Sequence, residues 1–370
     1  MSASSGTRFR ATRVEVDLGA IRHNVATLRP EGAELMAVVK ANAYGHGDVP
    51  VARAALEAGA TWLGVALVEE GVGLRSGGID APILVLSELP PGSEAVALAH
   101  RLTPTVASDA ALARLAAAAR GAVGVHVKVD TGMHRVGVWP PRDAAAFAER
   151  AERAGLAVEG LWTHLARGED DEGTTKQQLE TFHEVVEDAR RRGVEPRYRH
   201  AANSGGLLRH PEAHLDLVRP GIATYGIPPA PGVGQDLGLR PALAWRTEVS
   251  AVRRLAAGER VSYGHRYELA RDAWIATVPV GYADGYPRLA SSRADALLGG
   301  RRVRVAGNVT MDQLMVDADD DEPAPGDEVV LLGVQGDERV DAWELARHAE
   351  TIAYEIVTRI GERVPREHRG

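Results

Sequence analysis

The 370-residue sequence contains no cysteine, which excludes disulfide bonds, thiolate metal sites and cysteine nucleophiles. The absence is compatible with a cytoplasmic location, which we expect. No apolar run approaches the roughly 20 residues of a membrane-spanning helix. The net charge of −8 argues against a nucleic-acid-binding surface. Residues 1–13 are polar and lack the hydrophobic segment of a secretory signal, so none is expected.

The length suits one barrel followed by a smaller domain. Apolar runs typical of strands lie near residues 35–39, 62–67, 83–86, 102–106, 124–129, 158–162, 198–201 and 215–218. Amphipathic helical stretches separate most of them, as at 51–58, 110–119, 143–154 and 176–192. Eight strands alternating with helices predict an α/β fold, a (β/α)8 TIM-type barrel spanning residues 1–240. In such barrels, chemistry gathers at the carboxyl ends of the strands.

The sequence pattern changes after the Pro/Gly-rich segment 228–232, which cannot continue a helix or a central strand. Short strand-like runs near 249–255, 274–280, 303–306, 314–316 and 329–332 are separated by Gly, Pro and Asp turns. They predict a mainly antiparallel β domain over residues 241–370, closed by one amphipathic helix from 342 to about 359. The acidic run 317–322 lacks the spacing of a calcium loop and is interpreted as a solvated turn, so no metal is expected.

Residues 37–47 carry the most informative motif, Ala-Val-Val-Lys-Ala-Asn-Ala-Tyr-Gly-His-Gly. An apolar strand ends on Lys40, which places one amine at the mouth of a barrel or sheet. Desolvation there lowers the pKa of the amine and makes it a nucleophile toward aldehydes, as a Schiff base with pyridoxal phosphate requires. A lone lysine in this position is more often a surface residue at a strand end, so the choice depends on the whole motif.

The eleven residues closely resemble the cofactor-lysine signature of the alanine racemases, bacterial enzymes that use pyridoxal 5'-phosphate. The resemblance implies that Lys40 carries the cofactor and that Tyr44 lies beside its phosphate. It extends from about Val14 to Arg366 through several further motifs in the same order.

Three of these motifs follow strands of the predicted barrel. The resemblance implies that Arg219 meets the pyridine nitrogen and that the amides of Gly221 and Ile222 bind the phosphate. An arginine disfavours a second proton on that nitrogen, which weakens the ring as an electron sink and suppresses transamination. The resemblance further implies cofactor-site roles for Leu86, His164, Asn203 and Ser204, with His200 supporting Arg219. The loop after His164 departs from the usual family pattern.

The motif from Lys128 to Arg135 follows the fifth barrel strand. Two cations beside an anionic substrate repel each other unless one is neutralised. In many family members the matching lysine is carbamylated, and we expect the same of Lys128. Arg135 then binds the substrate carboxylate or the phenolic oxygen of the cofactor.

Racemisation needs proton-transfer groups on both faces of one carbon, and the resemblance implies that the β domain contributes the second one. Taken alone, a tyrosine before a glycine is more often a packing residue. The resemblance makes Tyr263 the base opposite Lys40, supplied across a homodimer interface. It also implies that Tyr282, Met311 and Asp312 approach the partner's substrate site, and that Tyr354 contacts the phosphate and narrows the pocket. His265, Arg266 and Thr310 depart from the family pattern.

These motifs together predict a two-base alanine racemase that works through a pyridoxal phosphate aldimine and supplies D-alanine for peptidoglycan. A racemase of the same fold with broader or serine preference stays open, since discriminating one small side chain is worth only about 1–3 kcal/mol. A related barrel decarboxylase is disfavoured by Arg219 and by the lack of cysteine. A non-catalytic cofactor carrier is disfavoured by Tyr263 and Tyr282. Neither nucleic acid nor membrane is expected as a partner.

Overall fold

The computed structural model describes residues 9–370 and divides them into two compact units. One unit is Leu18–Arg240. The other combines the described residues up to Asp17 with Pro241–Gly370. No helix formed by residues 9–370 is both long enough and apolar enough to cross a membrane.

Eight parallel strands form the sheet of the first unit, in the order β8-β7-β6-β5-β4-β3-β2-β9. Their bounds are β2 (Glu34–Val38), β3 (Trp62–Val65), β4 (Ile83–Glu88), β5 (Thr103–Val106), β6 (Val123–Lys128), β7 (Leu156–Trp162), β8 (Tyr198–His200) and β9 (Leu217–Val218). Between β8 and β9, backbone N–H groups of Asp216 and Arg219 donate to the carbonyls of Arg199 and Ala202, both at 3.0 Å. The sheet is therefore a nearly closed TIM-type barrel, as the sequence predicted.

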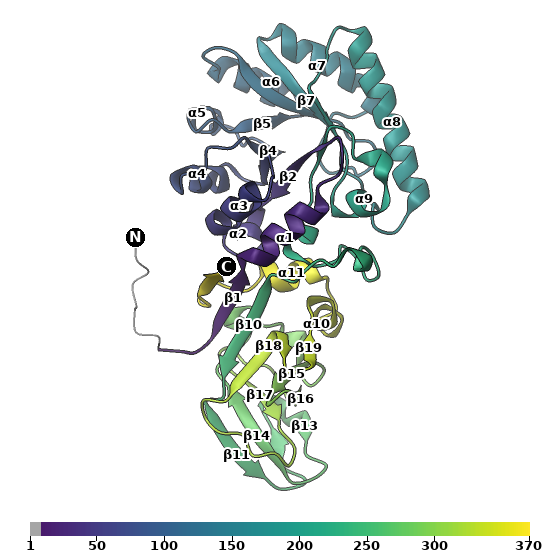
Figure 1. The fold of residues 1–370 in the computed structure, drawn as a ribbon. Coiled ribbons are helices and arrows are strands. Elements are labelled where there is room, and N and C mark those ends of the chain that lie inside the picture. The colour runs from purple at the N-terminus through teal and green to yellow at the C-terminus, as the bar shows by residue number, and fades with distance from the viewer. Residues whose placement is uncertain (1–8) are drawn as a thin grey trace. The chain divides into compact units, whose positions relative to one another are not determined.

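Helices lie on the outside of these strands (Figure 1). They are α1 (Leu18–Leu28), α3 (Asp48–Glu57), α4 (Val68–Ser76), α5 (Glu94–Ala99), α6 (Asp109–Ala118), α7 (Ala144–Arg153), α8 (Glu172–Arg191) and α9 (Ser204–Arg209). Side-chain caps fix where two of them begin. The Ser108 hydroxyl accepts from the N–H of Ala111, and the Asp171 carboxylate accepts from the N–H of Thr174.

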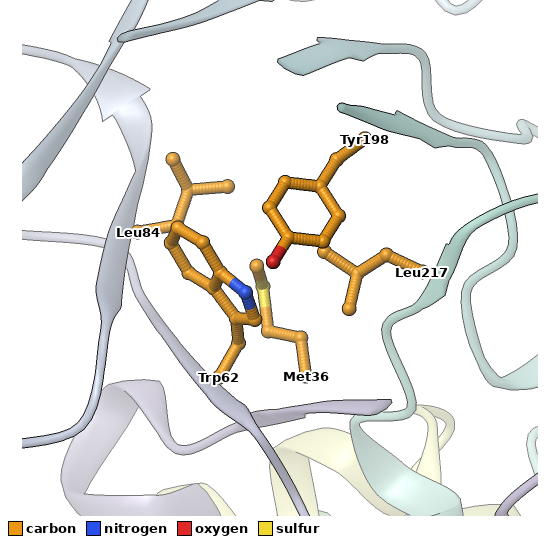
Figure 2. Packing of buried hydrophobic residues seen from close by; sticks show 5 residues of the cluster. All are labelled: Met36, Trp62, Leu84, Tyr198 and Leu217. Carbon is orange, nitrogen blue, oxygen red and sulfur yellow. The ribbon is translucent and has the colours of Figure 1, made fainter. Parts of the chain in front are cut away.

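The interior of the barrel is filled by large side chains from strands around the ring. Figure 2 shows the rings of Trp62 and Tyr198 and the side chains of Met36, Leu84 and Leu217 pointing toward one another. All five are at most 5% exposed. Because this cluster fills the barrel, the barrel is a packed core and functional groups are confined to its ends.

The second unit is built on one large, mainly antiparallel sheet in the order β11-β14-β17-β16-β15-β18-β10-β1-β20, with β19 paired to β18. The strands are β1 (Arg13–Asp17), β10 (Leu243–Glu248), β11 (Ala251–Leu255), β14 (Ala273–Val278), β15 (Asp295–Leu298), β16 (Arg301–Val305), β17 (Leu314–Asp317), β18 (Glu328–Gln335), β19 (Glu338–Val340) and β20 (Arg366–Arg369). A separate hairpin joins β12 (Arg260–Val261) and β13 (Tyr267–Glu268). It packs on a core that includes Leu269 and Ile275.

The structure differs from the sequence-based expectation at both ends of the chain. Residues 1–240 were expected to form the barrel domain, yet β1 pairs with β10 and β20 in the sheet of the other unit. One closing helix was expected, but there are two, α10 (Ala342–His348) and α11 (Ala353–Thr358). Glu350, with φ of 55°, breaks the helix between them, because a left-handed residue cannot continue a right-handed helix.

Candidate functional site

Polar side chains gather at the carboxyl ends of the barrel strands, as the sequence predicted. Lys40 follows β2, Lys128 ends β6, His164 lies just after β7, and Arg219 follows β9. Nη2 of Arg219 lies 3.4 Å from Nδ1 of His164. Besides burial, the charges of Arg219 and Lys40 help to lower the pKa of Lys128, and all three cations help to lower the pKa of His164. The barrel therefore brings together side chains that are up to 179 residues apart in sequence.

Lys40 opens a short left-handed turn, labelled α2 (Lys40–Tyr44). Ala41, Asn42, Ala43 and Tyr44 have φ values of 50–53°, in the region that residues other than glycine rarely adopt. Four consecutive residues of this kind store a few kcal/mol, at roughly 1–2 kcal/mol each. Surrounding contacts must hold such a turn in place, and strain of this kind next to Lys40 is typical of functional sites.

The turn delivers Tyr44 to the segment that follows β9. Tyr44 is buried, and its ring centroid lies 4.9 Å from that of Tyr225, whose hydroxyl donates to the Val38 carbonyl at 2.9 Å. A Cβ added to Gly221 would overlap the Tyr44 hydroxyl. Only glycine therefore lets the chain pass this close to the tyrosine.

Backbone amides converge beside Gly221. The N–H groups of Gly221 and Ala223 donate to the hydroxyl of buried Ser204, at 2.9 and 3.3 Å. Converging amides next to a glycine form the type of cradle that holds a phosphate. Ile222 begins the short helix η3 (Ile222–Tyr225) at the same place. The expected phosphate ligands Tyr44, Ser204 and Gly221 thus share one location.

Arg219 is buried, and all its hydrogen-bond partners are neutral. Nη2 donates to the carbonyls of Thr163 and Ala201, at 2.8 and 3.0 Å, and Nη1 lies 2.9 Å from Nδ1 of His200. The guanidinium also lies over the ring of Trp162, 4.8 Å from its centroid. Because an arginine only donates, Nδ1 of His200 is the acceptor, which confirms contact between these two residues.

The mouth of the barrel is strongly positive. Burial lowers the pKa of Arg219 to about 9 and that of Lys128 to about 8, with Arg135 and Arg219 adding repulsion at Lys128. Burial and Arg135 also lower the pKa of Lys40, while Glu70 opposes the shift. Among residues 9–370, none of Lys40, Lys128, Arg135 and Arg219 forms an ion pair with a carboxylate. Cations that form no such ion pair fit a ligand carrying phosphate and carboxylate groups.

His164 shares this electrostatic environment. Burial and the surrounding cations, Arg219 first, lower its pKa well below the ordinary value, so the imidazole is neutral near pH 7. Its backbone carbonyl accepts from the side-chain amide of Gln178 at 3.1 Å. The expected position of His164 beside Arg219 therefore agrees with the geometry.

Lys128 and Arg135 flank a loop built on Asp130. The Asp130 carboxylate accepts from the backbone N–H groups of Gly132 and His134, at 3.0 and 2.9 Å. The Val138 N–H donates to the Lys128 carbonyl at 2.8 Å, and this hydrogen bond closes the loop at its base. Lys128 itself is only 2% exposed, and its amine lies 4.8 Å from the centroid of the Trp162 ring.

Two predicted barrel residues have structural roles. Asn203 caps α9, because its side-chain oxygen accepts from the N–H of Gly206 at 2.9 Å. Its amide donates to the Leu165 carbonyl at 3.2 Å. Leu86 is partly buried and packs against the cluster inside the barrel. Their predicted contacts with a cofactor remain predictions.

The other predicted residues belong to the second unit. Tyr263 begins the short helix η5 (Tyr263–His265), and its side chain is 75% exposed although its carbonyl accepts from Asn308 at 2.6 Å. Tyr282 and Met311 are also exposed large side chains. Asp312 forms an ion pair with Arg363 at 2.8 Å. Tyr354 lies on α11, so these residues occupy several separate elements of the unit.

Sequence reasoning overlooked several polar residues near the mouth of the barrel. Glu70 binds the turn after Lys40, and His126 lies 2.8 Å from His200. Gln178 reaches the same region from α8 and donates to the Thr131 hydroxyl at 3.1 Å. His126 had a usable signal, since it lies two positions before Lys128 on one strand and therefore shares its face. Glu70 and Gln178 lie on helices and had none.

Comparisons with known proteins agree over nearly the whole chain. The profile described as "Alanine racemase, N-terminal domain" matches residues 16–229, and "Alanine racemase, C-terminal domain" matches residues 242–368. An alanine racemase of Symbiobacterium thermophilum is 51% identical, covering 98% of both chains. One from Thermobifida fusca is 46% identical, covering 96% of this chain and 97% of that one.

Solved structures give the same result. The alanine racemase of Streptomyces lavendulae, described as a D-cycloserine producer, superposes with a TM-score of 0.94 at 43% identity over 98% of both chains. That of Bacillus anthracis, solved with bound L-Ala-P, superposes with a TM-score of 0.93 at 38% identity. The match covers 99% of this chain and 96% of that one.

Proposed function

This chain belongs to the alanine racemase family of amino-acid racemases, and on that premise we propose that it interconverts L-alanine and D-alanine with pyridoxal 5'-phosphate. The observation that best supports this proposal is the cluster at the barrel mouth, where Lys40, Lys128, Arg135 and Arg219 form no ion pair with a carboxylate of residues 9–370. When bound, the cofactor supplies an aldehyde that joins amines covalently and a ring that withdraws electrons from the adjacent carbon.

The residues at the mouth of the barrel fit that cofactor. Burial lowers the pKa of Lys40, which increases the share of neutral amine that can react with the aldehyde. Gly221 and Ile222 would bind the phosphate through their amides, with help from Tyr44 and Ser204. The family resemblance assigns Tyr354 to the same phosphate. Leu86, His164 and Asn203 would line the same site.

Arg219 would face the pyridine nitrogen. Its pKa of about 9 keeps it protonated near neutral pH, so it donates a hydrogen bond and supplies no acceptor for a proton on that nitrogen. His200 orients it from behind by accepting from Nη1. This arrangement keeps electron withdrawal modest and favours the return of a proton to Cα over transamination.

Racemisation requires a proton to leave one face of Cα and return on the other. The proposal assigns the first face to Nζ of Lys40 and the second to the phenol oxygen of Tyr263. Tyr263 is exposed on its own unit, so its phenol is available to another surface. We assign it, with Tyr282, to the active site of a partner subunit in a homodimer.

Substrate binding is assigned to the other predicted residues. Arg135 would hold the carboxylate of alanine, for which an arginine fork is well suited. Tyr282, Met311 and Asp312 of the partner subunit would line the approach. A pocket that excludes one small side chain discriminates by about 1–3 kcal/mol, so serine is the competitor to measure first.

Carbamylation of Lys128 is part of the proposal. With a pKa of about 8, about a quarter of its amines are neutral at pH 7.5, against about one in a thousand at the ordinary value. A neutral amine adds to carbon dioxide and releases a proton, which leaves a negative carbamate to bind Arg135. Incubation with 13C-labelled bicarbonate should give a carbamate signal in NMR that Lys128→Ala abolishes. A signal that survives this substitution would refute the assignment.

One assay tests the proposed function directly. Purified protein should racemise L-alanine far faster than L-serine or L-lysine, and only when pyridoxal phosphate is present. Equal rates on alanine and serine would support the broader-specificity alternative. Activity on lysine alone, or full activity in cofactor-free protein, would refute the proposal. The released D-alanine would supply peptidoglycan synthesis.

A further inference from the structure

Glu70 makes one contact more than its place in a helix explains. It lies in the first turn of α4 and is half-buried. Its Oε2 accepts from the N–H groups of Ala66 and Leu67, at 2.7 and 3.0 Å, the usual task of an acid three residues into a helix. Its Oε1 accepts from the N–H of Ala41 at 2.6 Å, 29 residues earlier. The carboxylate therefore ties α4 to the turn that begins at Lys40.

The N–H that Glu70 accepts is the first one in the left-handed turn. The turn stores strain at four consecutive residues, so its conformation depends on contacts made from outside. Glu70 supplies one of these contacts at the lysine end. At the next residue, the Asn42 side-chain oxygen accepts from the N–H of Asp48 at 3.0 Å. Without Glu70, the residue next to Lys40 would lose its anchor.

Glu70 is also a negative charge near Lys40. Burial and Arg135 lower the pKa of Lys40, and Glu70 is the group that acts in the opposite direction. Lys128 and His164 are groups near Lys40, whose charge contributes, after burial and the arginines, to lowering the pKa of both. At a mouth lined by cations, Glu70 limits how far the lysine is pushed toward its neutral form.

We propose that Glu70 is a positioning residue for Lys40, whose carboxylate fixes the left-handed turn behind the lysine and sets a negative charge against its ammonium. The inference deepens the proposed function, in which the Lys40 amine holds the cofactor and moves the proton. Glu70 itself touches neither cofactor nor substrate and acts only through Lys40 and its turn.

The lysine content of the chain makes the charge effect measurable. Only three lysines occur, Lys40, Lys128 and Lys176, and Lys176 is exposed on α8. Trace acetylation of the full chain, freed of cofactor, followed by mass spectrometry gives the pH midpoint of Lys40 with Lys176 as an internal reference. Glu70→Gln keeps the size of the side chain and removes its charge, so the Lys40 midpoint should fall.

Glu69→Gln is the matched control. Glu69 is the adjacent residue of α4 and is exposed. Its replacement by glutamine removes one negative charge, as Glu70→Gln does. It should leave the Lys40 midpoint at the wild-type value. A midpoint that is unchanged or raised in Glu70→Gln, or lowered equally in Glu69→Gln, would overturn the proposal. Loosening of the turn alone would admit water and raise the midpoint, so the sign separates the two effects.

Glu70→Asp tests the geometric part. Its carboxylate keeps the charge but is one methylene shorter, too short to reach both Ala41 and Leu67. Amide hydrogen exchange over residues 41–47 should rise about 10-fold, without the fall in the Lys40 midpoint seen in Glu70→Gln. Wild-type exchange in both variants would show that Glu70 does not hold the turn.

A third measurement separates this proposal from the proposed function. Borohydride reduction after addition of pyridoxal phosphate should leave the adduct on Lys40 in the wild type. An adduct absent from wild-type Lys40 would refute the proposed function, while midpoint and exchange would still decide the role of Glu70. An adduct on Lys40 with wild-type midpoint and exchange in every Glu70 variant would refute the positioning role alone.

Discussion

The residues assigned to catalysis come from two regions that differ in how completely the chain builds them. At the mouth of the barrel, Arg219 is 3% exposed and Lys128 is 2% exposed, and neighbouring groups fix each of them. In the other unit, Tyr263 is 75% exposed and Met311 is 54% exposed. The barrel residues of the proposed site are buried and fixed by contacts within one chain, and we call them the finished half. The residues of the other unit present their side chains to solvent, and we call them the exposed half.

Exposure of large side chains has a physical meaning here. Tyr263, Tyr282 and Met311 all lie among the exposed hydrophobic residues of one unit, together with Leu289 and Ile352. Large side chains that stay exposed are available to a surface of another chain, as the proposed homodimer requires. The difference in exposure agrees with the proposed division of roles, in which the barrel would bind the cofactor and a partner subunit would supply the base for the second face.

The largest expected effect tests the finished half. Lys40→Ala removes the only group proposed both to hold the cofactor and to move a proton, so racemisation should fall by at least about 10⁴-fold. Assays of L-alanine conversion by circular dichroism measure it. Lys176→Ala, at an exposed lysine of α8, is the control and should retain full activity. Substantial activity in Lys40→Ala would disprove the assignment of the finished half.

The next effect tests the exposed half. Tyr263→Phe removes a proton-transfer group and should lower kcat by about 10²–10⁴-fold. Cofactor binding, which the proposal assigns mainly to the barrel, should persist. The control is Tyr267→Phe, since the Tyr267 hydroxyl donates to Asp317 at 2.7 Å and has no proposed catalytic role. Equal loss of activity in both variants would indicate that Tyr263 acts through structure alone.

The sequence predicted most of the fold because periodicity follows from burial. All eight predicted barrel strands are present. These strands are largely apolar because they are buried between the barrel interior and the surrounding helices. The partner of β1 was not predictable, because pairing with β10 and β20 joins residues more than 220 positions apart. The break between α10 and α11 was also missed. It depends on the left-handed conformation of Glu350, a residue with no marked turn preference.

The part of the candidate site that lies at the ends of strands was predictable from the sequence. Lys40, Lys128, His164 and Arg219 follow strands, and the closure of a barrel brings such ends together. Glu70 was missed because its contact with Ala41 crosses from a helix to a turn, which no periodic pattern encodes. The left-handed conformation of the turn was also missed, since alanine and tyrosine rarely adopt it.

A third prediction concerns the cost of building positive charge into the barrel. In buffer free of carbon dioxide, Lys128→Met should raise the thermal midpoint and lower activity. The folded pKa of about 8 lies below the unfolded value of 10.5, so the folded state binds fewer protons between them. Wild-type stability therefore rises with pH across that window.

The gain in the free energy of unfolding from Lys128→Met follows from this pH dependence of the wild type. It is largest below pH 8, up to about 3 kcal/mol, and disappears near pH 10.5. Differential scanning calorimetry at both ends of the window measures it. Lys176→Met is the control, because an exposed lysine carries no desolvation cost and should change little. Destabilisation by Lys128→Met at neutral pH would show that the buried amine is not the costly element.

The smallest expected effect distinguishes a phosphate cradle from ordinary packing. Ser204→Ala leaves the amides of Gly221 and Ala223 without their shared acceptor and should destabilise cofactor-free protein by about 1–2 kcal/mol. If those amides bind the phosphate, pyridoxal phosphate provides new acceptors and should restore most of the lost thermal midpoint. Ser76→Ala, at an exposed serine that ends α4, should show neither effect. A Ser204→Ala deficit that persists at saturating cofactor would mean that the amides serve only the fold. In that case the finished half of the site would bind its anion elsewhere.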